Sequence, residues 1–170
     1  MITIRKVQLS EADELLSFSK KTFYEFFAHL NSPENMEAYS AVSFTPQRIN
    51  AELSQPDSEF YFALNGDEIA GYIKINYDNA QTEYKDTDAL EIERIYVSGH
   101  HHGKKIGKLL LNFAIDIALN RKFSYIWLGV WDQNHNAIGF YDHHGFKPCG
   151  SHDFFLGNDR QTDILMKKEL

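Results

Sequence analysis

The sequence predicts a mixed α/β domain that occupies all 170 residues, a length that buries a sizeable core without disulfides or metal. Three patterns predict this class. Residues 60–64 and 68–78 are apolar runs on either side of Asn65-Gly66, which is typical of a β-hairpin. Residues 125–131 are almost continuously apolar, as in a central strand. Other apolar residues recur at helical spacing before and between these strands.

The first part of the chain is expected to hold one strand and three helices ahead of the hairpin. Residues 2–7 form a short strand, and a helix then runs to about His29 with Asp13 at its N3 position. Three helix starts are expected, each at a polar N-cap residue: Ser10, Ser32 and Thr45. Proline follows the second and third of these, where its fixed φ suits the first helical turn.

The second part alternates strands and helices. Residues 90–97 are expected to form a strand. Its alternation predicts two faces: Glu91, Glu93 and Ile95 on one, and Ile92, Arg94 and Tyr96 on the other. A helix over residues 104–119 follows, and a short one over residues 136–143 ends at Gly145. Two segments close the sheet: residues 146–150 and 161–170.

The composition favours a cytoplasmic protein. The net charge of −7 argues against a nucleic-acid partner and leaves room for a cationic substrate. Neither a signal peptide nor an apolar stretch long enough for a membrane span is expected. The single Cys149 excludes an internal disulfide and is expected to be a small buried residue. The three histidines at 100–102 are adjacent and cannot converge on one ion, so no metal site is expected.

The segment that follows residues 90–97 is a candidate anion site. A helix start carries unpaired N–H groups and a partial positive charge, and both favour phosphate. Gly103 and Gly107 let the backbone approach a bulky anion closely. Three lysines add charge around it: Lys104, Lys105 and Lys108. The segment matches neither a Walker A loop nor a dinucleotide-binding fingerprint. Taken alone, the segment is also consistent with a flexible loop that binds no anion and whose lysines are solvated.

A second pattern narrows the ligand. Residues 134–146 follow the strand at 125–131 and have the pattern N-x-x-A-x-x-F-Y-x-x-x-G-F. With the strand, loop and helix before it, this segment resembles the GCN5-related N-acetyltransferase (GNAT) family. The order of elements agrees over the whole chain. The resemblance implies acetyl-coenzyme A (acetyl-CoA) as co-substrate. It also implies the GNAT fold, a mixed and mostly antiparallel splayed sheet flanked by helices.

The resemblance also implies binding positions for the cofactor. The family's loop pattern is Q/R-x-x-G-x-G/A, and here His102, Lys105 and Gly107 stand at the Gln/Arg, first Gly and last positions. Lys105 therefore requires a backbone geometry that a non-glycine residue can adopt. The residues that would wrap the pyrophosphate are His102, Gly103, Lys104, Lys105, Ile106, Gly107 and Lys108. The residues that would contact the pantetheine arm are Ile95, Tyr96 and Val97, through their backbone, and Asn134.

The chemistry requires a proton acceptor and a proton donor. An amine attacks a thioester only as the neutral form, whereas an alkylammonium has a pKa of about 10. Glu91 and Glu93 are the candidate bases, acting through water, because both lie on the strand beside the implied thioester. Solvated or ion-paired glutamates are the alternative. By motif position, Tyr141 would stand near the sulfur and protonate or stabilise the departing thiolate.

Longer stretches resemble the bacterial spermidine/spermine N-acetyltransferases of the PaiA type, among them residues 31–39, 68–83, 126–138 and 157–166. That resemblance implies a primary amine of a polyamine as the acceptor. Two alternatives stay open. One is a GNAT enzyme with another acceptor, such as a protein N-terminus, an amino acid or an antibiotic. The other is a CoA-binding regulatory domain without turnover. The number of subunits is also open, with a homodimer among the alternatives.

Overall fold

The computed structural model describes residues 1–170 and contains one seven-stranded sheet. The strands lie in the order β1-β2-β3-β4-β5-β7-β6, and every neighbouring pair is antiparallel except β4 and β5. Their bounds are Ile2–Lys6 (β1), Ser58–Asn65 (β2), Glu68–Asn76 (β3), Ala89–Val97 (β4), Tyr125–Trp131 (β5), Lys147–Leu156 (β6) and Asp159–Glu169 (β7). The predicted mixed, mostly antiparallel sheet is confirmed.

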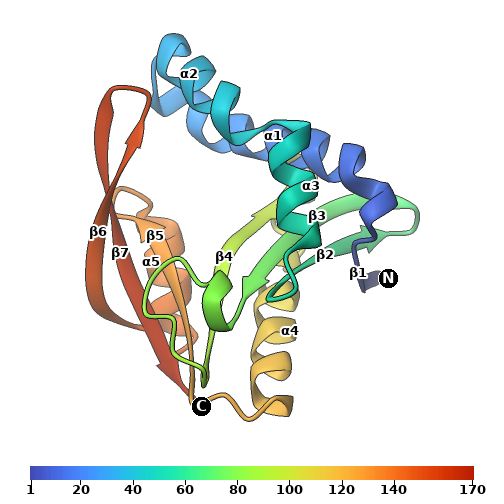
Figure 1. Ribbon diagram of the computed structural model, residues 1–170, viewed down its shortest axis with the longest axis vertical. Helices are drawn as coiled ribbons and strands as arrows, with labels where there is room; N and C mark the ends of the chain where they lie inside the picture. Colours follow the sequence, from blue (N-terminus) through green and yellow to red (C-terminus); the bar gives the residue numbers. More distant parts are fainter.

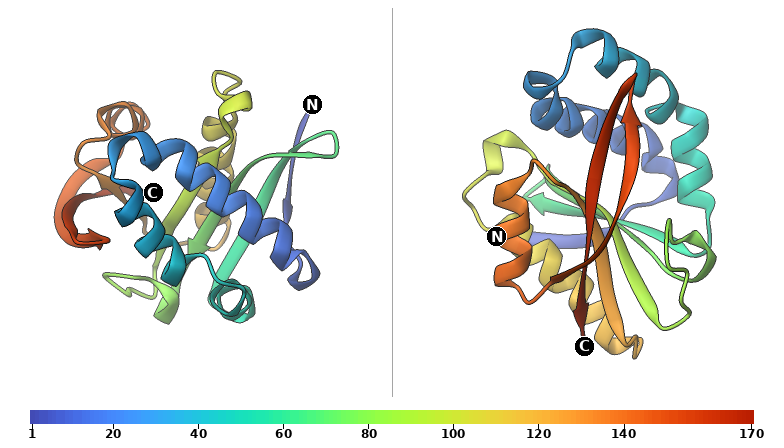
Figure 2. Two further views of the ribbon diagram at one scale, coloured as in Figure 1. Left: turned by 90° about the horizontal axis from the view of Figure 1, so that it is seen from above. Right: turned by 90° about the vertical axis from the view of Figure 1, so that its left-hand side faces the viewer.

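Helices cover both faces of this sheet. The α-helices are Ala12–Phe27 (α1), Pro33–Ser43 (α2), Pro46–Ser54 (α3), Ile106–Asn120 (α4) and His135–His143 (α5). Helices α1 and α3 pack against one face of the β1–β4 half, and α4 packs against the other. Figure 2 shows α1 crossing the molecule toward β6, which α2 contacts. None of these helices combines the length and the apolar character that crossing a membrane requires.

The two halves of the sheet separate after a short stretch of parallel pairing. Strands β4 and β5 are paired only over residues 89–92 and 125–128. Beyond that stretch β4 stays paired with β3, and β5 stays paired with β7. Figure 1 shows the two halves diverging from this point, which we call the vertex. The sheet is therefore splayed, as the family resemblance implies.

A β-bulge interrupts β4 just beyond the vertex. The register with β3 passes from Lys74 opposite Arg94 to Ile75 opposite Ile92. Glu93 is therefore the extra residue of the bulge and has no partner on β3. An extra residue reverses the alternation of side chains beyond it.

The bulge corrects one prediction about the faces of β4. Ile95 does not share a face with Glu91, because Ile92 and Ile95 both pack against the core beneath α4. Arg94 instead points toward α3, where it contacts Glu52. The charged residues of β4 consequently gather on the side of α1 and α3.

A network of four charged residues ties α3 to the bulge: Glu52, Lys74, Glu93 and Arg94. The guanidinium of Arg94 donates two hydrogen bonds to the carboxylate of Glu52, at 2.8 and 3.0 Å. Lys74 Nζ lies 3.3 Å from the same carboxylate. Burial alone would raise the pKa of Glu52, but the positive charges of Arg94 and Lys74 lower it to about 2.

The helix starts agree with the sequence prediction at two of three places. Side-chain hydrogen bonds to the first turn confirm two N-caps, Ser32 and Thr45. The prediction for Ser10 is wrong, because a short 3-10 turn comes first and α1 begins at Ala12. The carboxylate of Glu11 accepts hydrogen bonds from the backbone N–H of Gln8 and from the guanidinium of Arg5. These bonds fix the turn ahead of the helix.

The later elements lie close to their predicted positions. Helices α4 and α5 begin and end within two residues of the expected bounds. The strand expected over residues 146–150 continues to Leu156 as β6. The prediction that Cys149 is buried is wrong: it is exposed, because β6 is the edge strand and most of its residues face solvent.

The charged network makes stability depend on pH through Glu52. Its folded-state pKa of about 2 lies below the usual value of 4.5, so its stabilisation is complete above pH 4.5 and disappears as the pH falls toward 2. We expect Glu52→Gln to lose up to about 3 kcal/mol of unfolding free energy at pH 6 and to flatten the fall between pH 5 and 2. Urea unfolding at several pH values measures both effects.

The control is Glu14→Gln, which removes an exposed carboxylate of α1 that forms no ion pair. An equal pH dependence in Glu52→Gln and the parent protein would show that the network does not stabilise the fold.

Candidate functional site

A cavity of about 1570 Å³ lies between the diverging halves of the sheet. Pockets for a single small ligand usually measure about 300–1000 Å³, so this one has room for a long cofactor and a second substrate. The predicted site residues that line it are Glu91, Glu93, Ile95, Tyr96, Val97, His102, Gly103, Lys105, Ile106, Gly107, Lys108, Asn134 and Tyr141. Lys104 is the predicted residue that does not line the cavity.

The edge of β4 over residues 95–97 borders the cavity and has no strand partner on the side of β5. Backbone N–H and C=O groups on such an edge need hydrogen-bond partners. The edge leads from the vertex at Ile92 to the loop that precedes α4. An extended ligand that carries amide groups can therefore pair with it as an added strand would.

The loop between β4 and α4 presents backbone N–H groups to the cavity. Lys105 is the N-cap of α4 and adopts the left-handed conformation, with φ 61° and ψ 18°. Its side chain does not cap the helix, so the N–H groups of residues 106–108 remain available to an anion. A non-glycine residue pays about 1–2 kcal/mol for this conformation. Lys105 thus keeps the backbone geometry of the glycine that the family pattern has there.

Gly107 leaves space in front of this helix start. A Cβ atom built on Gly107 would meet no atom within 4 Å, although the residue lines the cavity. The packing of the protein itself therefore does not require glycine at this position. The absence of a side chain leaves room for a ligand against the first turn of α4.

The neighbouring histidines turn toward different partners. His101 is buried, with Nδ1 2.9 Å from Ser98 Oγ and Nε2 3.7 Å from the carboxylate of Glu68. His102 is exposed, and its Nε2 lies 2.9 Å from the carbonyl oxygen of Val97. The rings of His101 and His102 therefore fix the ends of the loop and do not converge on one point.

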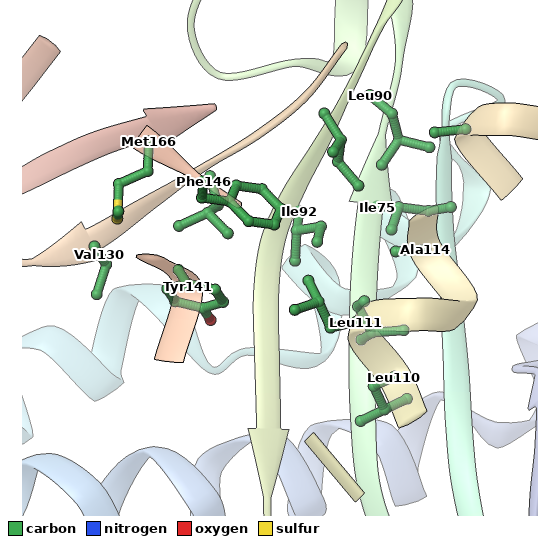
Figure 3. Packing of buried hydrophobic residues seen from close by; sticks show 14 of the residues in the cluster. Ile75, Leu90, Ile92, Leu110, Leu111, Ala114, Val130, Tyr141, Phe146 and Met166 are labelled. Carbon is green, nitrogen blue, oxygen red and sulfur yellow. The ribbon is translucent and has the colours of Figure 1, made fainter. Parts of the chain in front are cut away.

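Tyr141 of α5 borders the cavity beside the vertex. Its ring packs edge-to-face on Phe140 and Phe146, at centroid distances of 5.3 and 5.8 Å, and Figure 3 shows it next to Val130 and beside β4. Its hydroxyl has no hydrogen-bond partner within the protein and is not sealed from solvent. Burial raises the pKa of Tyr141 well above its usual value, so the hydroxyl stays protonated at neutral pH.

Asn134 has a structural partner as well as a place in the cavity wall. Its Oδ1 accepts a hydrogen bond from the backbone N–H of Ala137 at 3.2 Å and caps α5. The amide nitrogen of the same side chain keeps its two donors for a ligand.

The structure places Glu91 in a buried, hydrogen-bonded position. Its carboxylate accepts hydrogen bonds from the backbone and side chain of Thr82 and from Asn76 Nδ2 at 3.0 Å. The residue is only 2% exposed. Burial raises the pKa of Glu91, and the hydrogen bonds from Thr82 and Asn76 only partly oppose that rise.

Glu93 differs from Glu91 because positive charges surround it. Its carboxylate contacts Lys74 and Arg94 and accepts a hydrogen bond from Asn76 at 2.7 Å. Burial would raise the pKa of Glu93, but Arg94 and Lys74 hold it below its usual value. Glu93 is therefore an ion-pair member, whereas Glu91 takes up a proton more readily.

Sequence reasoning missed the polar residues of the opposite wall of the cavity. Its polar members are Glu83, His152 and Asp163, and its aromatic members are Phe26, Phe27, Tyr39, Phe44, Trp131 and Phe154. The aromatic rings belong to one cluster, in which Phe27 and Trp131 lie 5.6 Å apart. One local feature of the sequence pointed to this wall. Gly129 interrupts an otherwise apolar central strand, and such a glycine marks a place where a ligand or another part of the chain comes close to the strand.

Comparisons with known proteins identify the family of this chain. The model of the Acetyltransferase (GNAT) family matches residues 20–146. An uncharacterized N-acetyltransferase from Lactobacillus delbrueckii subsp. lactis is 40% identical, over 100% of this chain and 99% of its own length. The spermidine N(1)-acetyltransferase of Thermoplasma acidophilum is 24% identical, over 99% of this chain and 97% of its own length.

A solved structure with the same fold contains a bound cofactor. It is the PaiA N-acetyltransferase from Thermoplasma acidophilum in complex with coenzyme A. The TM-score is 0.79 with 24% identity, covering 100% of this chain and 99% of the other. The fold of the present chain is therefore the GNAT fold.

The open space at Gly107 gives a test of the anion site. We expect Gly107→Val to weaken coenzyme A binding at least tenfold, because the added side chain fills the space against the helix start. Stability should change by less than about 1 kcal/mol, since a Cβ atom at this position meets no atom within 4 Å. Calorimetric titration with coenzyme A and thermal unfolding measure the two quantities.

The matched control is Gly139→Val in α5, where a new Cβ is equally unobstructed but the residue does not line the cavity. Equal affinities in the two variants would contradict an anion site at Gly107.

Proposed function

The chain belongs to the GNAT family of N-acetyltransferases, and on that basis we propose that it transfers the acetyl group of acetyl-CoA to a primary amine of a polyamine. The main support for acetyl-CoA as the donor is the unpaired edge of β4, which leads from the start of α4 to the vertex. Such an edge matches a molecule with a pyrophosphate at one end, amides in the middle and a thioester at the other. The acceptor half rests on the acidic and aromatic wall and on the polyamine relative.

The donor is held mainly by backbone groups. Residues 95–97 pair with the pantetheine amides, and the loop of residues 102–108 surrounds the pyrophosphate, with the free N–H groups of residues 106–108 and with lysine charges. Asn134 donates its amide N–H groups to the pantetheine arm while its oxygen caps α5. Lys104 contributes long-range charge only, because it lies outside the cavity wall.

Tyr141 is the proton donor to the sulfur. When the tetrahedral intermediate collapses, the leaving thiolate needs a proton or a hydrogen bond. The hydroxyl of Tyr141 is protonated at neutral pH, lacks a protein partner and stands in the cavity beside the vertex. A buried tyrosine hydroxyl usually has a partner, so the unpaired one points to a ligand.

The two strand glutamates have different roles. Glu91 is the β4 carboxylate that acts on the acceptor, because its charge is not matched by a nearby cation and it borders the cavity. Glu93 positions the bulge through Lys74 and Arg94. The negative charge of Glu91 attracts an ammonium group to the vertex.

The opposite wall suits a polyamine. Carboxylates at Glu83, Glu91 and Asp163 attract ammonium groups, and the aromatic cluster around Trp131 contacts the methylene segments between them. The spermidine N(1)-acetyltransferase of Thermoplasma acidophilum aligns with nearly the full chain and supports this acceptor class.

Thiol release from acetyl-CoA, measured against a panel of amines, tests the proposal. We expect spermidine and spermine to give kcat/KM values at least tenfold above lysine, a peptide N-terminus or an aminoglycoside antibiotic. A preference for one of the latter would overturn the polyamine assignment. Cofactor binding without acceptor-dependent thiol release would contradict turnover altogether.

The role of Tyr141 predicts a separation of kcat from cofactor affinity. We expect Tyr141→Phe to lower kcat at least tenfold while leaving the dissociation constant of coenzyme A within about twofold, because only the hydroxyl is lost. Phe140→Leu in the same helix is the packing control. Parallel losses of kcat, affinity and thermal stability in Tyr141→Phe would mean that the residue is structural.

A further inference from the structure

Asp163 of β7 reaches into the cavity over β5, at a place where β5 has no side chain. In the strand register Asp163 stands opposite Trp131, but its carboxylate leans over Gly129. A Cβ atom built on Gly129 would lie 3.4 Å from Asp163 Oδ2. Gly129 is the first residue of β5 beyond the pairing with β4. Asp163 therefore borders the vertex from the β5 side, as Glu91 does from the β4 side.

Asp163 is also the carboxylate at the vertex with the fewest protein partners. Glu93 is ion-paired with Lys74, and Glu91 accepts three hydrogen bonds at 2% exposure. The side chain of Asp163 is 22% exposed, and its nearest titratable partner is His152 Nε2 at 3.5 Å. A substrate ammonium can contact Asp163 directly, whereas contact with Glu91 requires a protein donor to be displaced.

His152 of β6 connects Asp163 with the loop between β3 and β4. Its Nε2 faces Asp163, and its Nδ1 lies 3.1 Å from Glu83 Oε1. The side chain of Glu83 is 38% exposed. The three groups thus form a row from the cavity to solvent.

The titratable groups around Asp163 come from each element packed against it. They are His152 on β6, Asp132 after β5, and Glu83 beyond His152. Burial raises the pKa of Asp163 to about 6, with His152 opposing the rise and Asp132 adding to it. A carboxylate of this kind is mostly ionised at neutral pH and close to the value that suits a general base.

Resting on the proposed acetyl transfer, we infer that Asp163 accepts the first proton that the acceptor ammonium loses, and that His152 positions it. The N–H bond breaks, an O–H bond forms on Asp163, and the electron pair left on nitrogen forms the bond to the thioester carbon. The C–S bond then breaks, and sulfur keeps its electron pair and takes a proton from Tyr141. The second nitrogen proton restores Tyr141, and the first leaves Asp163 for solvent, to which its side chain is 22% exposed. Glu91 contributes its charge.

The dependence of kcat/KM on pH tests this assignment. With Asp163 as base, kcat/KM for the amine is nearly flat between pH 7 and 9, because the base is ionised and the ammonium, with a pKa of about 10, is protonated. In Asp163→Asn only the free amine reacts, so log kcat/KM rises with a slope near one. We expect a loss of about 100-fold at pH 7 that shrinks about tenfold per pH unit.

His152→Gln tests the positioning role. Loss of the imidazole removes the group that lowers the pKa of Asp163. The apparent pKa below which kcat/KM falls should therefore rise by about 0.5 pH unit. If His152 were merely structural, His152→Gln would lower kcat/KM without changing this apparent pKa.

Two further variants keep the assignment falsifiable. Glu91→Gln should lower kcat/KM with its slope unchanged, and Asp159→Asn, on the same strand but exposed, should match the parent. A flat profile in Asp163→Asn, or a slope of one in Glu91→Gln instead, would overturn the assignment. Carbon-13 NMR titration of the Asp163 carboxyl requires no turnover. A midpoint near 6 supports the assignment, and a midpoint near 4 overturns it even if no amine proves to be a substrate.

Discussion

The site depends on one constraint, which is that the parallel pairing of β4 and β5 ends after four residues on each strand. Backbone groups of a central strand are normally satisfied by the next strand, so the free edge of β4 needs another partner. The bulge at Glu93 and the side-chain gap at Gly129 both lie immediately beyond the last paired residues. The cavity, the cofactor edge and the acidic groups all follow from this separation.

The carboxylates around the vertex fall into two sets, one ion-paired and one without a cation partner. Glu52 and Glu93 are paired with Lys74 and Arg94, and this set holds the bulge in place. Asp163 and Glu91 have no comparable cations, and their pKa values are raised by burial. A rigid vertex with two readily protonated carboxylates is suited to removing a proton from a substrate. The ion-paired residues fix the geometry, while the two unpaired carboxylates can change charge.

The sequence predicted the elements of the proposed donor side well because they are local along the chain. The strand, the loop with Lys105 and the start of α4 are consecutive, and Tyr141 follows a recognisable pattern. It predicted the faces of β4 less well, since a bulge depends on the register with β3 and leaves no mark in the alternation of β4 itself. The roles of Asp163 and His152 were missed because each depends on a partner strand or loop distant in sequence.

The contrast between elements that are consecutive in sequence and elements that meet only in the fold also explains why the donor is easier to identify than the acceptor. The acceptor wall combines the end of α1, the segment after α2, the end of β5 and the edge strand β6, which touch only in the folded chain. A substitution in any of these elements reshapes the wall without altering the free edge of β4. Relatives can therefore share the donor site and differ in the amine they accept. In this chain the wall combines carboxylates with aromatic rings, and this combination is the basis of the proposed polyamine acceptor.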